Sequence, residues 1–131
     1  MSQLDHVTIT AADFARSFAF YDAALRALGL HRLVELVDEE EDEPAVEAAA
    51  WGPEGGEGVV WLVSGTPETR NAHVRLRAAS RGEVQDFHDA ALAAGGTGHA
   101  APRRWTPYRR GDFNAIVRDP AGNLIEAVAP E

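Results

Sequence analysis

Two stretches of this chain are alike and lie 67 residues apart. FYDAAL at 20–25 matches FHDAAL at 87–92, and the same spacing relates His6 to His73. Each histidine begins a strand-like stretch, HVTIT or HVRLR, that precedes the helical one. Similarity at a fixed spacing is typical of a structural unit that occurs more than once. The sequence therefore predicts an α+β fold with two tandem βαβββ units.

The pattern of apolar residues places the elements of both units. Helical spacing predicts helices near 13–28 and 81–94. Asp13 is a candidate N-cap of the first helix, and Ser80 with Glu83 has the spacing of a capping box before the second. Glycines stand where the helices should end, at Gly29, Gly95 and Gly96. The remaining pattern predicts strands at 3–10, 31–37, 45–51, 58–64, 72–78, 97–101, 112–118 and 123–128.

Residues alternate between apolar and polar along the first and fifth strands. Val7 and Ile9 point opposite to His6, and Val74 points opposite to His73. The apolar sides suit packing under a helix. If the two units join edge to edge and the mixed sheet curves, the polar sides line a cleft instead of facing water.

Length, charge and cysteine content limit the remaining possibilities. A chain of 131 residues suits one domain, 1–131, with units at about 3–64 and 71–129. No apolar run is long enough to span a membrane, and the N-terminus has no signal-peptide pattern. The chain has no cysteine, which fits a cytoplasmic protein. The net charge of −9 argues against nucleic acid as a partner.

Two segments carry runs of like charge. DEEEDE at 38–43 is interpreted as a solvated loop between two strands, with a cation-binding or partner-binding tract as the alternative. RRWTPYRR at 103–110 has four arginines and two aromatic residues, and it is also interpreted as a loop. That loop is either part of the surface or a lid over a site for an anionic or aromatic ligand.

Glu126 interrupts the apolar last strand, in DPAGNLIEAV. A carboxylate in such a strand costs free energy unless it is paired or bound to a metal. It either pairs with an arginine of HVRLR or joins His6 and His73 in a metal site. Two imidazoles and one carboxylate bind a divalent ion and leave coordination positions open. The set suits Fe, Mn, Ni, Co or Zn and does not select among them.

The sequence resembles the glyoxalase/bleomycin resistance/dioxygenase superfamily, also called vicinal oxygen chelate proteins. The resemblance covers the whole chain and is carried by DHVTITAADFARSFAFYDAALRALGL, AHVRLRA and FNAIVRDPAGNLIEAV. It implies paired βαβββ units, a curved sheet, a metal in the cleft and usually a homodimer. The metal ligands of the superfamily correspond to His6, His73 and Glu126.

The chain also departs from the patterns of its apparent relatives. Glyoxalase I-like members have a fourth ligand, a glutamate, where this chain has Trp61 in GVVWLVSG. Tryptophan cannot bind the metal, so the three-ligand extradiol dioxygenase branch is more similar. Those enzymes also use a nearby histidine and tyrosine, for which His99 and Tyr108 are candidates by residue type. Many relatives have aromatic residues before the DP turn, where this chain has DFN at 112–114.

These features predict a metal-dependent enzyme of dioxygenase or lyase type. Its substrate is expected to be a small molecule that chelates the metal through adjacent oxygens. Arg75 is expected to face the cleft, where it binds an anionic group of the substrate or offsets Glu126. Trp61 and Phe113 are further candidates for substrate contact, and Trp61 equally suits the core. The alternative is a resistance protein that sequesters a small drug or toxin without catalysis.

Overall fold

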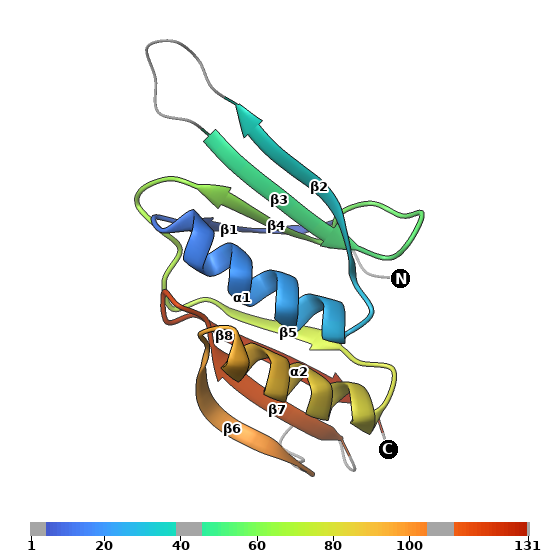
Figure 1. The fold of residues 1–131 in the computed structure, drawn as a ribbon. Coiled ribbons are helices and arrows are strands. Elements are labelled where there is room, and N and C mark those ends of the chain that lie inside the picture. The colour runs from blue at the N-terminus through green and yellow to red at the C-terminus, as the bar shows by residue number, and fades with distance from the viewer. Residues whose placement is uncertain (1–4, 39–45, 105–111, 131) are drawn as a thin grey trace.

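The computed structural model describes residues 5–38, 46–104 and 112–130. Its elements follow the predicted order (Figure 1). The first unit consists of β1 (Val7–Ala11), α1 (Phe14–Ala27), β2 (His31–Asp38), β3 (Val46–Gly52) and β4 (Val60–Ser64). The second consists of β5 (His73–Arg77), α2 (Arg81–Ala93), β6 (Thr97–Arg104), β7 (Phe113–Arg118) and β8 (Leu124–Ala129). The α+β fold with tandem βαβββ units is thus confirmed.

Each unit forms its own open, mixed, four-stranded sheet. The strand orders are β1-β4-β3-β2 and β5-β8-β7-β6. In both sheets the first strand of the unit pairs in parallel with the last, and the other neighbours are antiparallel. The two units therefore have the same topology. None of the helices in the described part of the chain is long and apolar enough to cross a membrane.

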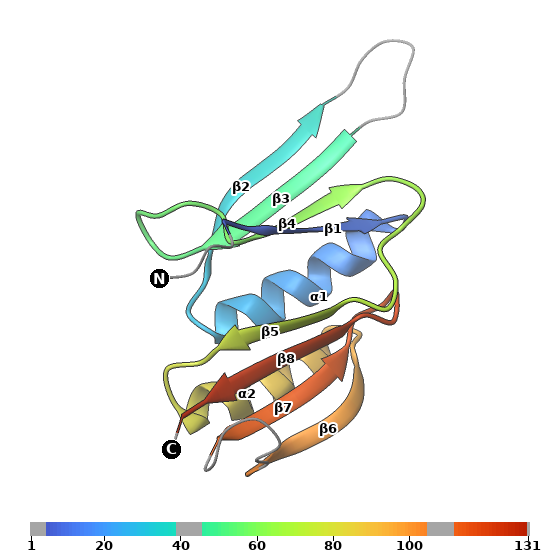
Figure 2. The same cartoon turned by 180° about the vertical axis from the view of Figure 1, so that it is seen from behind.

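Both helices lie on one side of the two sheets, as Figure 1 shows, and the turned view in Figure 2 looks onto the opposite faces. α1 packs on β2, β3 and β4, α2 packs on β6, β7 and β8, and the helices contact each other. One apolar cluster fills this layer, and its largest fully buried side chains include Trp51, Tyr21, Phe20 and Phe87. Neither helix covers the opposite faces of the sheets.

The predicted helix boundaries are close to the observed ones because the capping groups act as expected. Asp13 Oδ1 accepts a hydrogen bond from the backbone N–H of Arg16 at 3.2 Å. Ser80 Oγ accepts one from the N–H of Glu83 at 3.1 Å. Each bond satisfies a donor that the first helical turn leaves unpaired.

Strand β6 is longer than the sequence indicates. Arg103 and Arg104, interpreted above as part of a loop, are its last residues, and they pair with Asn114 and Phe113 of β7. Backbone hydrogen bonding to β7 outweighs the weak strand preference of the arginines. Residues 105–110 of the proposed lid and 39–43 of the acidic tract lie outside the described residues.

Candidate functional site

The open face of the second sheet carries the polar residues of the candidate site. Parallel pairing of β5 with β8 aligns His73 with Leu124 and Arg75 with Glu126. Residues in register on neighbouring strands point to the same face. The alternation that packs Val74 against the apolar core therefore leaves His73 and Arg75 on the open face.

Glu126 is fully buried, and both of its carboxylate oxygens are bound. Oε1 lies 2.8 Å from Nε2 of His73. Oε2 accepts a hydrogen bond of 3.1 Å from Nε of Arg75 and one of 2.8 Å from Nδ2 of Asn114. The structure thus contains the expected ion pair between Arg75 and Glu126.

These contacts keep Glu126 ionised. Burial alone would raise its pKa, since desolvation penalises the charged form. Hydrogen bonds from Asn114, Arg75 and His73, together with the positive charge of Arg75, outweigh burial and lower the pKa below its ordinary value. An ionised carboxylate only accepts hydrogen bonds, so Nε2 of His73 donates to it.

His73 and Glu126 fit a role as two ligands of one metal ion. Their donor atoms are 2.8 Å apart. Neighbouring ligands at about 2.1 Å from one ion are roughly 3.0–3.4 Å apart, so a metal ion would take the place of the Nε2 proton and separate the two atoms slightly. Arg75 and Asn114 hold the other oxygen of Glu126, as groups behind a ligand carboxylate commonly do. However, no three His, Cys, Asp or Glu side chains gather around one point within the described part of the chain.

The third expected ligand, His6, belongs to the first unit. It comes directly before β1 and lies 3.9 Å, Nδ1 to Oδ1, from Asp5, with its side chain 46% exposed. With Trp61, Leu33 and Val34 it lines a cavity of about 570 Å³. Asp5 and Glu57 also line this cavity, so the structure places His6 in a cavity of its own unit that has both apolar and acidic walls.

One chain does not bring the two histidines together. β1 and β5 run in opposite directions in Figure 2. Since His6 precedes the start of β1 and His73 begins β5, they lie toward opposite ends of these strands. His73 and Glu126 are thus two of the three expected donors, and His6 lies apart from them.

Trp61 of the first unit occupies the place that Glu126 has in the second. Thr8 is aligned with Trp61 in the pairing of β1 with β4, as Arg75 is with Glu126. Thr8 and Arg75 are also related by the 67-residue repeat. The equivalence supports the position inferred for Trp61 from the sequence, and the first unit offers no carboxylate there.

The other predicted site residues lie elsewhere. His99 is exposed on β6, with Nδ1 3.3 Å from Nη2 of Arg118. Phe113 packs against the apolar core, and the guanidinium of Arg81 lies 5.2 Å from its ring centroid. Phe113 therefore faces the helix side of the sheet, and its contact with a substrate stays a prediction. Tyr108 lies outside the described residues.

Asn114 is a site residue that sequence reasoning missed. It is buried on β7 and donates to Glu126, while its own Oδ1 has no hydrogen-bond partner among the described residues. The signal was present, since an amide side chain in the apolar run FNAIV is as unusual as a carboxylate in LIEAV. Only the pairing of β7 with β8 shows that the two belong together.

Comparison with known proteins agrees with this architecture. The family model described as "Glyoxalase/Bleomycin resistance protein/Dioxygenase superfamily" matches residues 3–127. The chain belongs to this superfamily. No curated protein sequence matches the chain.

Solved structures of the glyoxalase/bleomycin resistance superfamily have the same fold. A glyoxalase/bleomycin resistance protein from Albidiferax ferrireducens T118 is 25% identical, with a TM-score of 0.70 over 99% of this chain and 100% of that one. Glyoxalase I from Zea mays is 18% identical, with a TM-score of 0.66 over 95% and 46%. The fosfomycin resistance protein FosX from Listeria monocytogenes is 15% identical, with a TM-score of 0.62 over 100% and 95%.

Proposed function

We propose that this protein is a divalent-metal-dependent enzyme of dioxygenase or lyase type that acts on a small oxygenated molecule. The observation that carries the proposal is the buried, ionised Glu126 held 2.8 Å from His73. A bound metal would supply Lewis-acid chemistry and a template for a substrate with adjacent oxygens. In this protein, Arg75 and Asn114 hold Oε2 of Glu126 and so fix the direction in which Oε1 points toward His73.

We further propose that the site is shared between two copies of the chain. One copy supplies His73 and Glu126, and the other supplies His6. Two copies are needed because His6 lies apart from His73 and Glu126 within a single chain. The open face of the first sheet, with Trp61 and Val34, would then give an apolar wall opposite the polar face of the second. The working form of the protein would be a homodimer without nucleic-acid or membrane partners, in the cytoplasm.

Metal uptake tests this proposal. Stripped protein is titrated in turn with Fe(II), Mn(II), Ni(II), Co(II) and Zn(II), and bound metal is measured after gel filtration. We expect His73→Ala and Glu126→Gln each to lose uptake with an unchanged circular dichroism spectrum. His31→Ala is the matched control, since His31 is an exposed histidine of β2 beside Glu54. Stoichiometric binding retained in both site variants would contradict the proposal.

Mixing two defective chains tests the shared site. His6→Ala and His73→Ala each remove one ligand from every site of a homodimer. A mixed dimer regains one complete site, since the His6→Ala chain still supplies His73 and Glu126. We expect each variant alone to bind no metal and the refolded mixture to recover part of the uptake. Light scattering that shows a metal-loaded monomer, or a mixture without recovery, would exclude a shared site.

One observation favours the second candidate, a protein that sequesters a small molecule without catalysis. Arg75 neutralises Glu126, and Asn114 and His73 complete its hydrogen bonds, so the carboxylate is satisfied without a metal ion. If the wild-type protein takes up none of the five ions, this candidate replaces the first. The cavity beside Trp61 would then be the place to look for the bound compound.

A further inference from the structure

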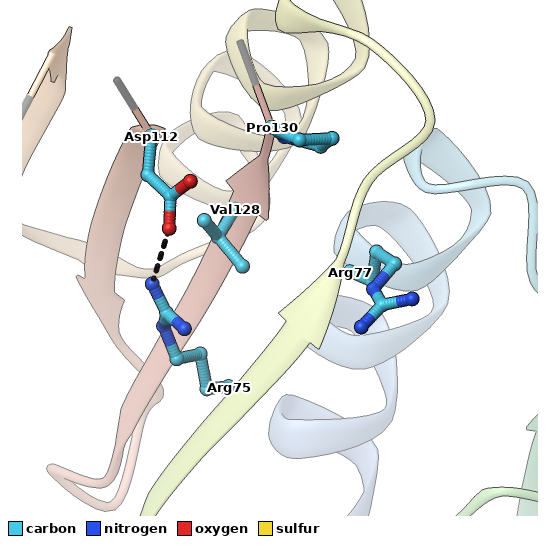
Figure 3. Close-up of a pocket in the computed structure, with 5 residues that line it drawn as sticks. All are labelled: Arg75, Arg77, Asp112, Val128 and Pro130. Atoms are coloured by element: carbon cyan, nitrogen blue, oxygen red, sulfur yellow. Dashed lines mark hydrogen bonds and ion pairs between the residues drawn. The ribbon is translucent and has the colours of Figure 1, made fainter. Parts of the chain in front are cut away.

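A small cavity opens on the second unit beside the Arg75–Glu126 pair. It has a volume of about 160 Å³ and is lined by Arg75, Arg77, Asp112, Val128 and Pro130 (Figure 3). Drug-sized sites begin at roughly 300 Å³. The cavity therefore suits a molecule of only a few heavy atoms.

The two arginines of the cavity differ in their surroundings. Arg75 reaches across to Asp112, with Nη2 3.4 Å from Oδ2 (Figure 3). It also binds Glu126. Arg77 is exposed, and no hydrogen bond or ion pair joins it to any of the described residues. A guanidinium at the wall of a cavity that has no partner among the described residues favours a carboxylate, which it can bind through two parallel hydrogen bonds.

Asp112 places a second constraint on the chemistry of a ligand in this cavity. The residue is buried, with its side chain 6% exposed, and lies on the far side of Val128 from Arg77 (Figure 3). A carboxylate accepts hydrogen bonds and donates none when ionised. The group of a ligand that meets Asp112 must therefore carry an O–H or N–H. Val128, paired with Arg77 across β5 and β8, provides an apolar surface between the two charges.

We propose that this cavity binds a small carboxylate that has a hydroxyl or ammonium group on the neighbouring carbon. The carboxylate contacts Arg77, the hydroxyl or ammonium group donates to Asp112, and the carbon chain lies on Val128. The proposal rests on the proposed function in that it takes this face of the second sheet as the substrate side. It adds the substrate class, which the His73–Glu126 pair alone does not specify.

Calorimetric titration with four matched probes tests the class. Lactate and alanine have both required groups, propionate lacks the donor, and lactamide lacks the negative charge. We expect lactate or alanine to bind at least about tenfold more tightly than propionate and lactamide. Propionate leaves Asp112 without a hydrogen-bond donor, and lactamide leaves Arg77 without a negative charge. The stronger of the two binders identifies the donor. Equal affinity for all four, or binding of none, overturns the proposal.

A pair of arginine variants tests the place of binding. Arg77→Gln should lower the affinity for the tightest-binding probe at least about tenfold, because it removes the positive charge that pairs with the carboxylate of the probe. Arg26→Gln is the matched control, since Arg26 is an exposed arginine of α1, away from the cavity. It should leave the affinity unchanged. If Arg77→Gln binds as tightly as wild type while remaining folded by circular dichroism, the ligand does not occupy this cavity.

The titrations are done on metal-stripped protein and repeated after metal loading, which separates the two proposals. Probe binding that depends on Arg77 in a protein that never takes up metal contradicts the proposed enzyme and leaves the ligand class standing. If metal uptake is normal and Arg77→Gln does not change probe binding, the ligand class is contradicted and the proposed enzyme is not.

Discussion

Tyr21 donates a hydrogen bond of 2.5 Å from its hydroxyl to Oδ2 of Asp119, which joins α1 of the first unit to the turn between β7 and β8 of the second. Both residues are buried. Burial, followed by the charge and the hydrogen bond of Asp119, raises the pKa of Tyr21, so the hydroxyl keeps its proton. Asp119 also accepts from the backbone N–H groups of Ala121 and Asn123. The carboxylate of Asp119 thus stabilises the turn between β7 and β8 and also connects it to α1 of the first unit.

Removing the hydroxyl should loosen the connection between the units. We expect Tyr21→Phe to lower the free energy of unfolding by about 1–3 kcal/mol, since it leaves a buried, charged acceptor with one bond fewer. Urea denaturation measures the change. Asp119→Asn and the double variant complete a cycle, in which a coupling near zero would show that the bond does not contribute to stability.

The two neighbouring arginines of β5 should differ in their effect on stability. Arg75→Met removes the ion-pair partner of the fully buried Glu126 and should lower the free energy of unfolding by about 1–3 kcal/mol. Breaking a fully buried ion pair costs roughly 3–5 kcal/mol. We expect a smaller loss here because the side chain of Arg75 is 37% exposed. Arg77→Met removes no such contact and should stay within about 0.5 kcal/mol of wild type. Equal losses in the two variants, measured by urea denaturation, would contradict the role given to Arg75.

The lowered pKa of Glu126 predicts a dependence of stability on pH. Because the folded-state pKa lies below the ordinary value of 4.5, the carboxylate stabilises the fold above about pH 4.5 and loses this effect as the pH falls through the folded-state pKa. Wild type should therefore exceed Glu126→Gln in unfolding free energy at pH 7, and the gap should narrow below pH 4.5. The control is Glu35→Gln, at an exposed residue of β2. A gap for Glu126→Gln that stays constant with pH would argue against an ionised, paired carboxylate.

The order of elements was predictable because each one is marked locally. Asp13 and Ser80 cap the helices, and the 67-residue repeat relates the two helices and the strands that precede them. Only part of the hydrogen-bond network around Glu126 was predictable from the sequence. The spacing of His73 and Arg75 showed that they share a face, but the contribution of Asn114 depends on the register between β7 and β8, which local sequence does not specify.

The relation between the units could not be predicted for a similar reason. The helical pattern of α1 marks Tyr21 as a core residue, yet its hydrogen-bond partner lies 98 residues away. The opposite directions of β1 and β5 likewise depend on how the two units pack against each other, which no local pattern specifies. Sequence equivalence of His6 and His73 therefore suggested nearness, whereas one chain places them apart.

The glycine that follows α1 should resist substitution because of its backbone conformation. Gly29 has a φ of +79°, in the left-handed region that a side chain disfavours, and an added Cβ would meet only Glu83 Oε2 at 3.9 Å. The cost of Gly29→Ala, about 1 kcal/mol, would thus come from the backbone and not from crowding. Gly82→Ala is the matched control within α2, where a Cβ has ordinary contacts, and alanine should stabilise the helix by about 0.5 kcal/mol. Thermal and urea denaturation of both variants measure these opposite signs, and a neutral or stabilising Gly29→Ala would contradict the left-handed conformation at the end of α1.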